Sequence, residues 1–446
     1  MSSDKTMNDL QLQLARGAFM VNFDLVKAAL RDGADVNGGP DPGVPPIVAA
    51  TIASNAGMVE FLLGQGADPE RPVTAVVPCP TCKVDGVTAK TKPGERALHV
   101  AVKIGNVEIV RLLLKGDCAD VDSTDDRGYT PLLVACSFQY TPAGVVRLLL
   151  DAGADPAAAA KDGCTPLHVV ALCEDMGKVD ILYSRAPATL NRCTANHRTP
   201  LFMACFNGNE RLVSKLLSLG AVQPKREGTA CPLSAAVLEG FVGVVRTLIN
   251  EGGIRAVGGE TVLTDALDIA VCYRRARILR LMLAAGGDEK RLERASNTTF
   301  SGRHLLHFGA GYGDPGVVSV LLEAGAHESV PDSEGLVPLD VIGRLPVPDE
   351  PAMDPKKGVA IRRMLRRGPA YRARSWAWPC DAEEAKDAGG SGDGDTAAAA
   401  AAGGGILSSR QAVKTPCVLG VRVFRPKGEN GNKLFARLVG RYCAKD

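Results

Sequence analysis

Asp162, Cys164 and His168 lie within seven positions of one another in the stretch DGCTPLHVVAL, which spans residues 162–172. A carboxylate, a thiol and an imidazole are groups that nucleophilic catalysis uses, because a neighbouring base can convert a thiol into a nucleophile. A catalytic nucleophile normally occurs once in a chain, whereas a structural element can be repeated. The first question is therefore whether this stretch recurs.

The stretch is one of several copies. Its common part is a small residue, a proline, a leucine and an apolar run, which returns as RGYTPLLVAC at 127–136, HRTPLFMACF at 197–206, TACPLSAAVL at 229–238 and EGLVPLDVIG at 334–343. The position of His168 is matched by His99 and His307, but elsewhere by Leu133, Phe202, Ser234 and Asp268. A position that accepts Leu and Phe is not a general base. The pattern therefore predicts a structural role for Asp162, Cys164 and His168.

A second phrase follows each copy at a fixed distance. It is clear as DLVKAALRDGADVN at 24–37 and as GVVRLLLDAGADPA at 144–157. The glycine that ends its helical part recurs at Gly33, Gly66, Gly116, Gly153, Gly220, Gly252, Gly286 and Gly325. Several of these steps are about 33 residues, a period typical of solenoid proteins.

Each unit is expected to form two helices. A Thr–Pro pair begins the first helix, because the Thr hydroxyl can cap it and Pro is tolerated at the first helical position. A Gly or Asn ends this helix, and the second helix carries a Val-Val-x-x-Leu-Leu face. The closing Gly supplies a left-handed C-cap. A single unit cannot bury its apolar face, so the units must stack on their neighbours.

These phrases resemble the ankyrin repeat, whose pattern is near GxTPLHxAAxxGxxxxVxxLLxxGADxN. The resemblance covers residues 10–370 with about ten units, and is best at 127–157 and 163–172. It implies an all-α solenoid of stacked helix-turn-helix units with outward hairpin loops. Two units depart from the pattern, with YSRAPATLN at 183–191 in place of Gly-Ala-Asp and RLPVPDEPAMDPKKG at 344–358 interrupting the last unit.

Composition places the chain among soluble intracellular proteins, cytoplasmic or nuclear. The formal net charge is +2, which gives no sign of a bulk polyanionic partner, and no window approaches the length of a membrane helix. Aromatic residues make up 4% and apolar residues 46% of the chain, which indicates a core of Leu, Val and Ala. Thirteen cysteines, recurring in apolar helical patterns at Cys136, Cys173, Cys205 and Cys272, are expected to be buried thiols rather than a disulfide framework.

The expected organisation has four parts: a tail at 1–9, an ankyrin array at 10–380, a low-complexity linker at 381–409 and a short basic segment at 410–446. The linker contains DTAAAAAAGGG and lacks large apolar residues, so disorder is expected. Within the array, 71–93 is expected to be a lengthened finger hairpin and 336–370 an atypical last repeat.

Cys79 and Cys82 in the finger have the C-x-x-C spacing of half a zinc site. No second C-x-x-C or His pair follows nearby, and His99 would be a lone further ligand. A zinc site, a redox pair and a plain hairpin remain open. No bound cofactor is expected.

Residues 355–379 carry many Lys and Arg side chains and no acidic one, with Tyr371, Trp376 and Trp378 interleaved. One interpretation is a contact with nucleic acid or an anionic membrane. The other is that this segment contains the second helix of the last repeat, with its Arg residues facing solvent and the Trp pair covering the open end of the stack.

The resemblance also implies which residues bind a partner. In ankyrin repeats the two positions before the Gly that ends the first helix face the concave groove. In this chain they are Lys103, Ile104, Ser137, Phe138, Leu172, Cys173, Phe206, Asn207, Leu238, Glu239, Cys272 and Tyr273, with Tyr312 beside Gly311. Phe138, Phe206, Tyr273 and Tyr312 would form a spaced aromatic stripe, or else pack against neighbouring units.

Function by resemblance is a non-catalytic scaffold or adaptor for a protein or peptide partner, which is favoured over nucleic acid, and a monomer is expected. No Walker loop, dinucleotide-binding glycine turn or metalloprotease motif is found. With most of the chain in repeats, little remains for a catalytic core. An adaptor that delivers a partner to an enzyme on another chain is the alternative.

Overall fold

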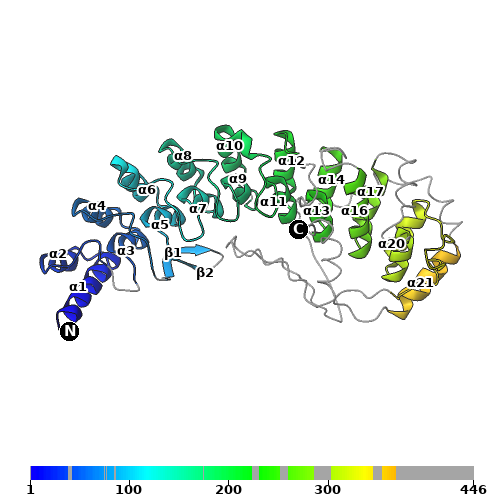
Figure 1. Ribbon diagram of the computed structural model, residues 1–446, viewed down its shortest axis with the longest axis horizontal. Helices are drawn as coiled ribbons and strands as arrows, with labels where there is room; N and C mark the ends of the chain where they lie inside the picture. The colour runs from blue at the N-terminus through cyan, green and yellow to red at the C-terminus, as the bar shows by residue number, and fades with distance from the viewer. Residues whose placement is uncertain are drawn as a thin grey trace, which may run out of the picture. The chain divides into compact units, whose positions relative to one another are not determined.

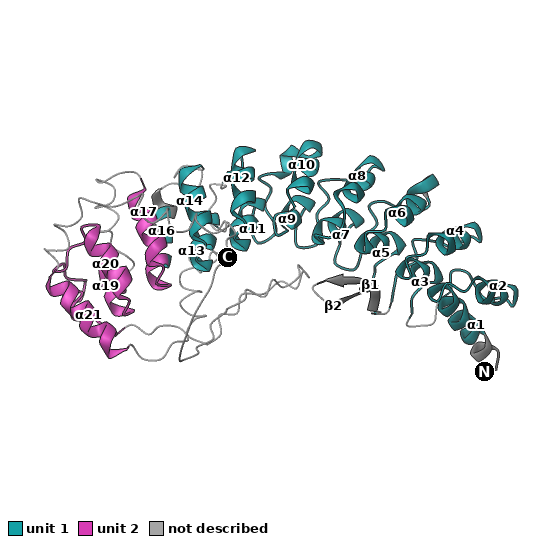
Figure 2. Cartoon of the chain, turned by 180° about the vertical axis from the view of Figure 1, so that it is seen from behind, with its two compact units in different colours: residues 1–269, 416–446 teal, residues 270–415 magenta. Residues whose placement is uncertain are grey.

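The computed structural model describes residues 2–38, 43–74, 76, 78–84, 87–173, 175–222, 231–251, 260–285, 303–344 and 354–367. Side chains at 2–6, 78–90, 117, 260–262 and 264 are outside this description. The described chain divides into two compact units (Figure 2), with unit 1 running to Ile269 and unit 2 beginning at Ala270. The linker at 381–409, the segment at 410–446 and the residues Tyr371, Trp376 and Trp378 lie outside the described residues.

Unit 1 is a row of helix pairs (Figure 1). The pairs are α1 (Ser2–Phe19) with α2 (Phe23–Arg31), α3 (Pro46–Ile52) with α4 (Ala56–Gly64), α5 (Ala97–Ile104) with α6 (Val107–Leu114), α7 (Pro131–Ser137) with α8 (Ala143–Asp151), α9 (Pro166–Val170) with α10 (Met176–Arg185), α11 (Pro200–Asn207) with α12 (Glu210–Ser218), and α13 (Pro232–Glu239) with α14 (Val242–Asn250). The first helices, from α3 to α13, pack on one another in an inner row, while the second helices form an outer row. The all-α repeat architecture predicted from the sequence is confirmed.

Short 3-10 turns follow two of the outer helices: η1 (Lys115–Asp117) and η2 (Pro187–Thr189). The second of these stands where the sequence lacks Gly-Ala-Asp. Helix α16 (Glu260–Cys272) spans the boundary between the two units, and unit 2 contains α17 (Ala276–Ala284), α19 (Leu305–Gly311), α20 (Pro315–Glu323) and α21 (Pro355–Arg366).

The helix ends follow the local chemistry of the repeat. Thr130 caps α7 by accepting a hydrogen bond from the Leu133 N–H at 3.3 Å, and Thr199 caps α11 in the same way at 3.2 Å from Phe202. The Asn expected to end the first helix instead begins the second: Asn106 accepts from the Ile109 N–H at 3.1 Å. Side-chain caps of this kind satisfy the free N–H groups of a helix N-terminus.

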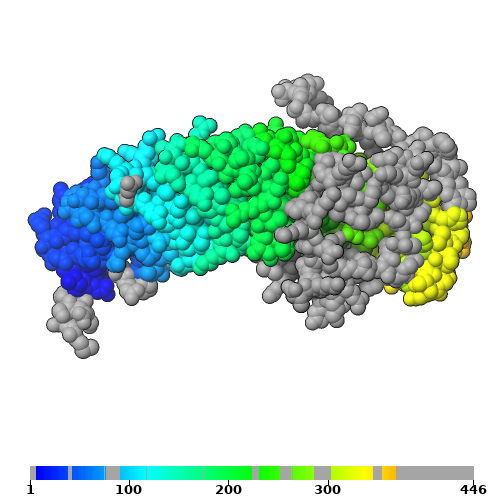
Figure 3. Space-filling model, turned by 45° about the horizontal axis from the view of Figure 1, so that its top comes forward, coloured from blue at the N-terminus to red at the C-terminus, as the bar shows by residue number. Residues whose placement is uncertain are grey.

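The core is built from Leu, Val, Ile and Ala of both rows. On α6, Ile109, Val110 and Leu113 are fully buried, and the same face of α12 buries Leu212, Val213 and Leu216. Figure 3 shows the repeats of unit 1, coloured blue to green, packed against one another without a break on the face in view. Burial between repeats rather than within them explains why single units need neighbours.

The finger at 71–93 contains β1 (Pro78–Val84) and β2 (Val87–Lys90), which pair antiparallel. The register places Pro78 opposite Lys90 and Val84 opposite Val87, with an irregularity between Cys79 and Lys83. Strand β1 contacts α3 and α5 of the inner row. This two-stranded sheet is an addition to the helical stack.

The two ends of the array differ from the expected boundaries. Residues 2–9, expected as a tail, form the first turns of α1. In the last repeat, residues 338–343 form turns instead of a first helix. Helix α21 packs on α20 through its buried Ile361 and Leu365, and its Arg362, Arg363 and Arg366 are exposed, as expected for a second helix with basic residues facing solvent.

Candidate functional site

His168 is held in place by structural hydrogen bonds. Its Nδ1 accepts from the Thr165 N–H at 3.3 Å, so the Nε2–H donates to the Arg198 carbonyl at 3.1 Å in the next repeat. His99 and His307 make equivalent bonds to the carbonyls of Tyr129 at 2.9 Å and Leu336 at 3.0 Å. Burial lowers the pKa of His168 to about 4, so the ring is neutral near pH 7.

Asp162 and Cys164 are equally structural. The Asp162 carboxylate accepts a hydrogen bond from the Cys164 N–H at 2.9 Å, which closes a tight turn. Burial and the nearby Asp162 charge raise the pKa of the Cys164 thiol to about 12. A protonated thiol is a poor nucleophile, and these contacts support the structural interpretation of the stretch at 162–172.

The turns that precede the inner helices are joined by backbone hydrogen bonds between neighbouring repeats. The Lys161 N–H donates to the Arg127 carbonyl at 3.2 Å, and the Ala195 N–H donates to the Asp162 carbonyl at 3.0 Å. At Gly163, where φ is +80°, a Cβ would lie 2.8 Å from the Ala195 nitrogen. Glycine is therefore required there both by the backbone conformation and by the approach of the next turn.

Each of four successive turns carries a basic side chain. We call this set the finger row, although only its first member belongs to the finger at 71–93: Lys92, Arg127, Lys161 and Arg198. The Arg127 Nη2 lies 2.9 Å from Asp125 Oδ2, and its guanidinium lies 4.4 Å from the Tyr129 ring centroid. The Arg198 guanidinium lies 5.4 Å from the centroid of Phe202. Aromatic rings thus support the two arginines of the finger row.

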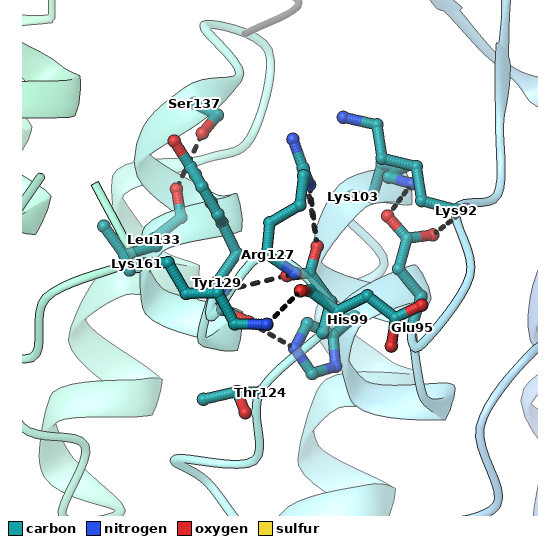
Figure 4. Close-up of polar contacts among 12 residues, drawn as sticks. Lys92, Glu95, His99, Lys103, Thr124, Arg127, Tyr129, Leu133, Ser137 and Lys161 are labelled. Atoms are coloured by element: carbon teal, nitrogen blue, oxygen red, sulfur yellow. Dashed lines mark hydrogen bonds and ion pairs between the residues drawn. The ribbon is translucent and has the colours of Figure 1, made fainter. Parts of the chain in front are cut away.

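Lys92 lies next to a buried ion pair (Figure 4). The Lys103 ammonium donates to Glu95 Oε1, and both side chains are almost completely buried, with 3% and 1% exposed. The second oxygen of Glu95 accepts from the Lys92 N–H at 3.0 Å. Burial, together with the positive charges of Arg127 and Lys103, lowers the pKa of Lys92 to about 8.

Five of the predicted partner-binding residues occupy one of two adjacent positions in successive repeats: Ile104 and Phe138 the second, and Leu172, Phe206 and Leu238 the first. Each is a partly exposed apolar side chain at, or within two residues of, the C-terminal end of an inner helix. We call this set the helix-end row: Ile104, Phe138, Leu172, Phe206 and Leu238. Phe138 contacts the ring of Tyr140 with centroids 5.3 Å apart, and Phe206 stacks on Phe202 at 6.1 Å.

Four predicted residues do not offer an exposed side chain, and one of them is Cys173. Lys103 is paired with Glu95, and Ser137 is buried and donates to the Leu133 carbonyl at 2.8 Å. In unit 2, Tyr312 is 4% exposed, and the Cys272 sulfur lies 3.7 Å from its hydroxyl. These side chains pack inside the protein because each has a local partner that the repeat pattern does not encode.

The other predicted residues have mixed environments. Asn207 is exposed, but its Nδ2 donates to the Leu172 carbonyl at 2.9 Å. Glu239 is partly exposed. Tyr273, in unit 2, is 37% exposed. The expected stripe of four exposed aromatic residues is therefore reduced, because Tyr312 is not at the surface.

Lys178 is a completely buried lysine whose position was not predicted from the sequence. It is the third residue after the N-cap of α10, where α6 has Ile109 and α12 has Leu212. Its ammonium donates to the carbonyls of Phe138 at 2.7 Å and Ala135 at 3.1 Å. The signal was present in the sequence: a lysine in an apolar position, one repeat after an inner helix that lacks a closing glycine.

Metal and membrane sites are not found in the described part of the chain. No three His, Cys, Asp or Glu side chains are grouped there as metal ligands, and Cys79 and Cys82 lie on β1, whose side chains are outside the described residues. No described helix has the length and apolar character needed to cross a membrane. Cys136 and Cys205 are free and buried, and burial raises the pKa of both thiols.

Comparison with known proteins agrees with this geometry. A family model described as ankyrin repeats in three copies matches residues 80–160, 143–227 and 167–257. The chain is 28% identical over 190 residues to the human transient receptor potential cation channel subfamily A member 1, covering 41% of this chain and 15% of that protein. It is 25% identical over 242 residues to the ankyrin repeat protein nuc-2 of Neurospora crassa, covering 54% and 22%.

A shorter match has higher identity. The chain is 44% identical over 77 residues to protein phosphatase 1 regulatory subunit 27 of Mus musculus, covering 17% of this chain and 48% of that protein. The chain thus spans less than half the length of each of these relatives. The stacked helix pairs, the inter-repeat histidine bonds and the family match lead to one conclusion: the chain is an ankyrin-repeat protein.

Proposed function

We propose that this chain is a non-catalytic scaffold or adaptor that binds a protein or peptide partner through the helix-end row of unit 1. Ankyrin repeats act in protein–protein interaction, and stacked repeats present extended binding surfaces. The observation that carries the proposal is the helix-end row itself: five consecutive repeats each place one partly exposed apolar side chain at one of the two adjacent positions that close the inner helix. Aromatic and apolar anchors in such rows provide much of the affinity of protein interfaces.

The neighbourhood of Phe138 and Phe206 fits anchoring residues. Both rings are already ordered by aromatic contacts, with Tyr140 and with Phe202 respectively. An ordered side chain loses less conformational entropy on binding than a mobile one. Free, buried thiols such as Cys136 are consistent with an intracellular, reducing compartment.

Delivery of the bound partner to an enzyme on another chain is a second candidate. The specific observation is the match to a protein whose name describes a regulatory subunit of protein phosphatase 1. Both candidates require the same binding surface, and they differ in what happens after binding.

The test is a quantitative pull-down from source-cell extract with the intact chain and a Phe138→Ala/Phe206→Ala variant. The matched control is Phe23→Ala/Phe61→Ala, which removes two partly exposed rings, 5.8 Å apart, from the outer helices α2 and α4. We expect partners that are depleted at least tenfold by the first variant and kept by the control, with circular dichroism showing both folded. Equal recovery of every partner by all three proteins would overturn the proposal.

A further inference from the structure

The finger row and the helix-end row are supplied by the same repeats. Lys92, Arg127, Lys161 and Arg198 stand on the turns that lead into α5, α7, α9 and α11. The far ends of the same four helices carry Ile104, Phe138, Leu172 and Phe206. Each of these inner helices therefore has a basic residue on the turn before it and an apolar one near its end, and the stacking of the helices places the two kinds of residue at opposite ends of the inner row.

The acidic groups nearby offset the positive charge of the finger row only in part. Glu95 and Asp125 have 1% and 0% of their side chains exposed, and they are paired with Lys103 and Arg127. Two further carboxylates remain on the turns: Asp126 is exposed, and Asp162 is partly exposed and accepts from the Cys164 N–H. The four basic groups and Lys103 exceed these four carboxylates by one formal positive charge.

The excess positive charge is concentrated at Lys92. Lys92 forms no ion pair within the described part of the chain, while Arg127 and Lys103 are near enough to disfavour its charge. Figure 4 shows these three basic side chains on neighbouring segments, with the Tyr129 ring beside Arg127. The lowered pKa of Lys92 reflects partial burial and positive neighbours that outweigh Glu95 and Asp125. An added carboxylate would relieve this repulsion.

Arg127 is suited to receive such a group. Its Nε and Nη2 both contact Asp125 Oδ2, at 3.2 and 2.9 Å, while its side chain remains 35% exposed. Stacking on Tyr129 holds the guanidinium plane in place. A guanidinium fixed in this way binds carboxylates with little further ordering.

We propose that the partner recognised by unit 1 is a linear protein segment rich in both acidic and large apolar residues, with its carboxylates bound along the finger row and its apolar side chains on the helix-end row. The proposal rests on the proposed function, and it adds the chemistry of the partner. Charge complementarity favours the acidic segment, and the apolar side chains at the other ends of the same helices disfavour a purely electrostatic ligand.

The test begins with a phage-displayed library of random dodecapeptides selected on the intact chain. We expect the selected peptides to be enriched in Asp and Glu together with Leu, Ile or Phe. Affinity is then measured by fluorescence anisotropy on Lys92→Glu/Lys161→Glu, with Arg111→Glu/Arg147→Glu as the control. The control makes the same change of charge at exposed positions of the outer helices α6 and α8. The first variant should weaken binding at least tenfold and the control less than twofold.

A second readout follows Lys92 directly. In NMR of the chain with 13C-methylated lysines, the resonance absent from a Lys92→Arg variant should titrate near pH 8 and move to higher pH when a selected acidic peptide is bound. If the charge-reversal variant unfolds, Lys92→Gln/Lys161→Gln provides the same comparison with a milder change.

Different results overturn the acidic-segment inference and the proposed function. Selected peptides without acidic enrichment, or with equal affinity for the Lys92→Glu/Lys161→Glu variant, overturn the acidic-segment inference. If those peptides still lose affinity with Phe138→Ala/Phe206→Ala, the proposed function stands. Peptides insensitive to the Phe variant overturn the proposed function as well, and failure to select any peptide counts against the inference.

Discussion

The Lys178 ammonium lies 2.7 Å from the carbonyl oxygen of Phe138, 40 residues earlier in the chain and one repeat away. Inner helices α5, α11 and α13 end at Gly105, Gly208 and Gly240, whose φ values are 76°, 78° and 86°. Helix α7 ends at Phe138 with φ −118° and has no left-handed cap. A cation near a helix C-terminus stabilises the last carbonyls. Lys178 therefore acts as the missing cap from the next repeat.

We predict that Lys178→Met destabilises the protein by about 1–3 kcal/mol, because it removes the ammonium from the carbonyls of Ala135 and Phe138 at the end of α7, although Phe138 keeps the Thr141 N–H at 3.3 Å. The measurement is urea unfolding followed by circular dichroism. The control is Ile109→Met, at the equivalent position of α6, where an apolar exchange of similar volume costs less than about 1.5 kcal/mol. A Lys178→Met protein as stable as the wild type would show that the ammonium does not cap α7.

We predict that acid destabilises unit 1 partly through His168. The folded pKa of about 4 lies below the ordinary value of 6.5, so the unfolded chain binds the proton more readily between these values. The contribution of His168 to the free energy of unfolding is therefore fully present above pH 6.5. It is lost as the pH falls toward 4, and the loss is on the order of 3 kcal/mol. Unfolding free energies measured across this range should fall less steeply for His168→Leu, which copies Leu133 of α7. Identical slopes would contradict the prediction.

We predict that Gly163→Ala is more destabilising than Gly153→Ala. Both glycines have positive φ, at +80° and +96°, so both changes carry a conformational cost of about 1–2 kcal/mol. Only at Gly163 does the new Cβ meet backbone, 2.8 Å from the Ala195 nitrogen, whereas nothing lies within 4 Å at Gly153. Thermal melts of the two variants should differ, and equal melting temperatures would show that the stacked turns can separate freely.

Much of the fold could be predicted from particular residues. Thr–Pro pairs mark the starts of α7, α9 and α11, because capping and proline chemistry are local. The structural role of His168 was also predictable, since Leu133 occupies its position in another repeat. The ring's partner, the Arg198 carbonyl, could not be named from sequence because it lies in the next repeat.

The candidate site was less predictable. The repeat pattern places Lys103 and Ser137 at surface positions, but a pattern gives register and not the partner that each side chain finds. Glu95 pairs with Lys103, and the Leu133 carbonyl accepts from Ser137. Lys178 was missed for the opposite reason: a charged residue on an amphipathic helix is normally expected at the surface. Its burial depends on carbonyls supplied by a helix 40 residues away.

The same capping contact determines how this array can be divided into fragments. The repeat that holds α7 depends on Lys178 of its neighbour, so the two repeats form one block that a cut between them would break. A fragment ending after Ala157 would separate that block, whereas fragments cut on either side of the pair would keep it whole.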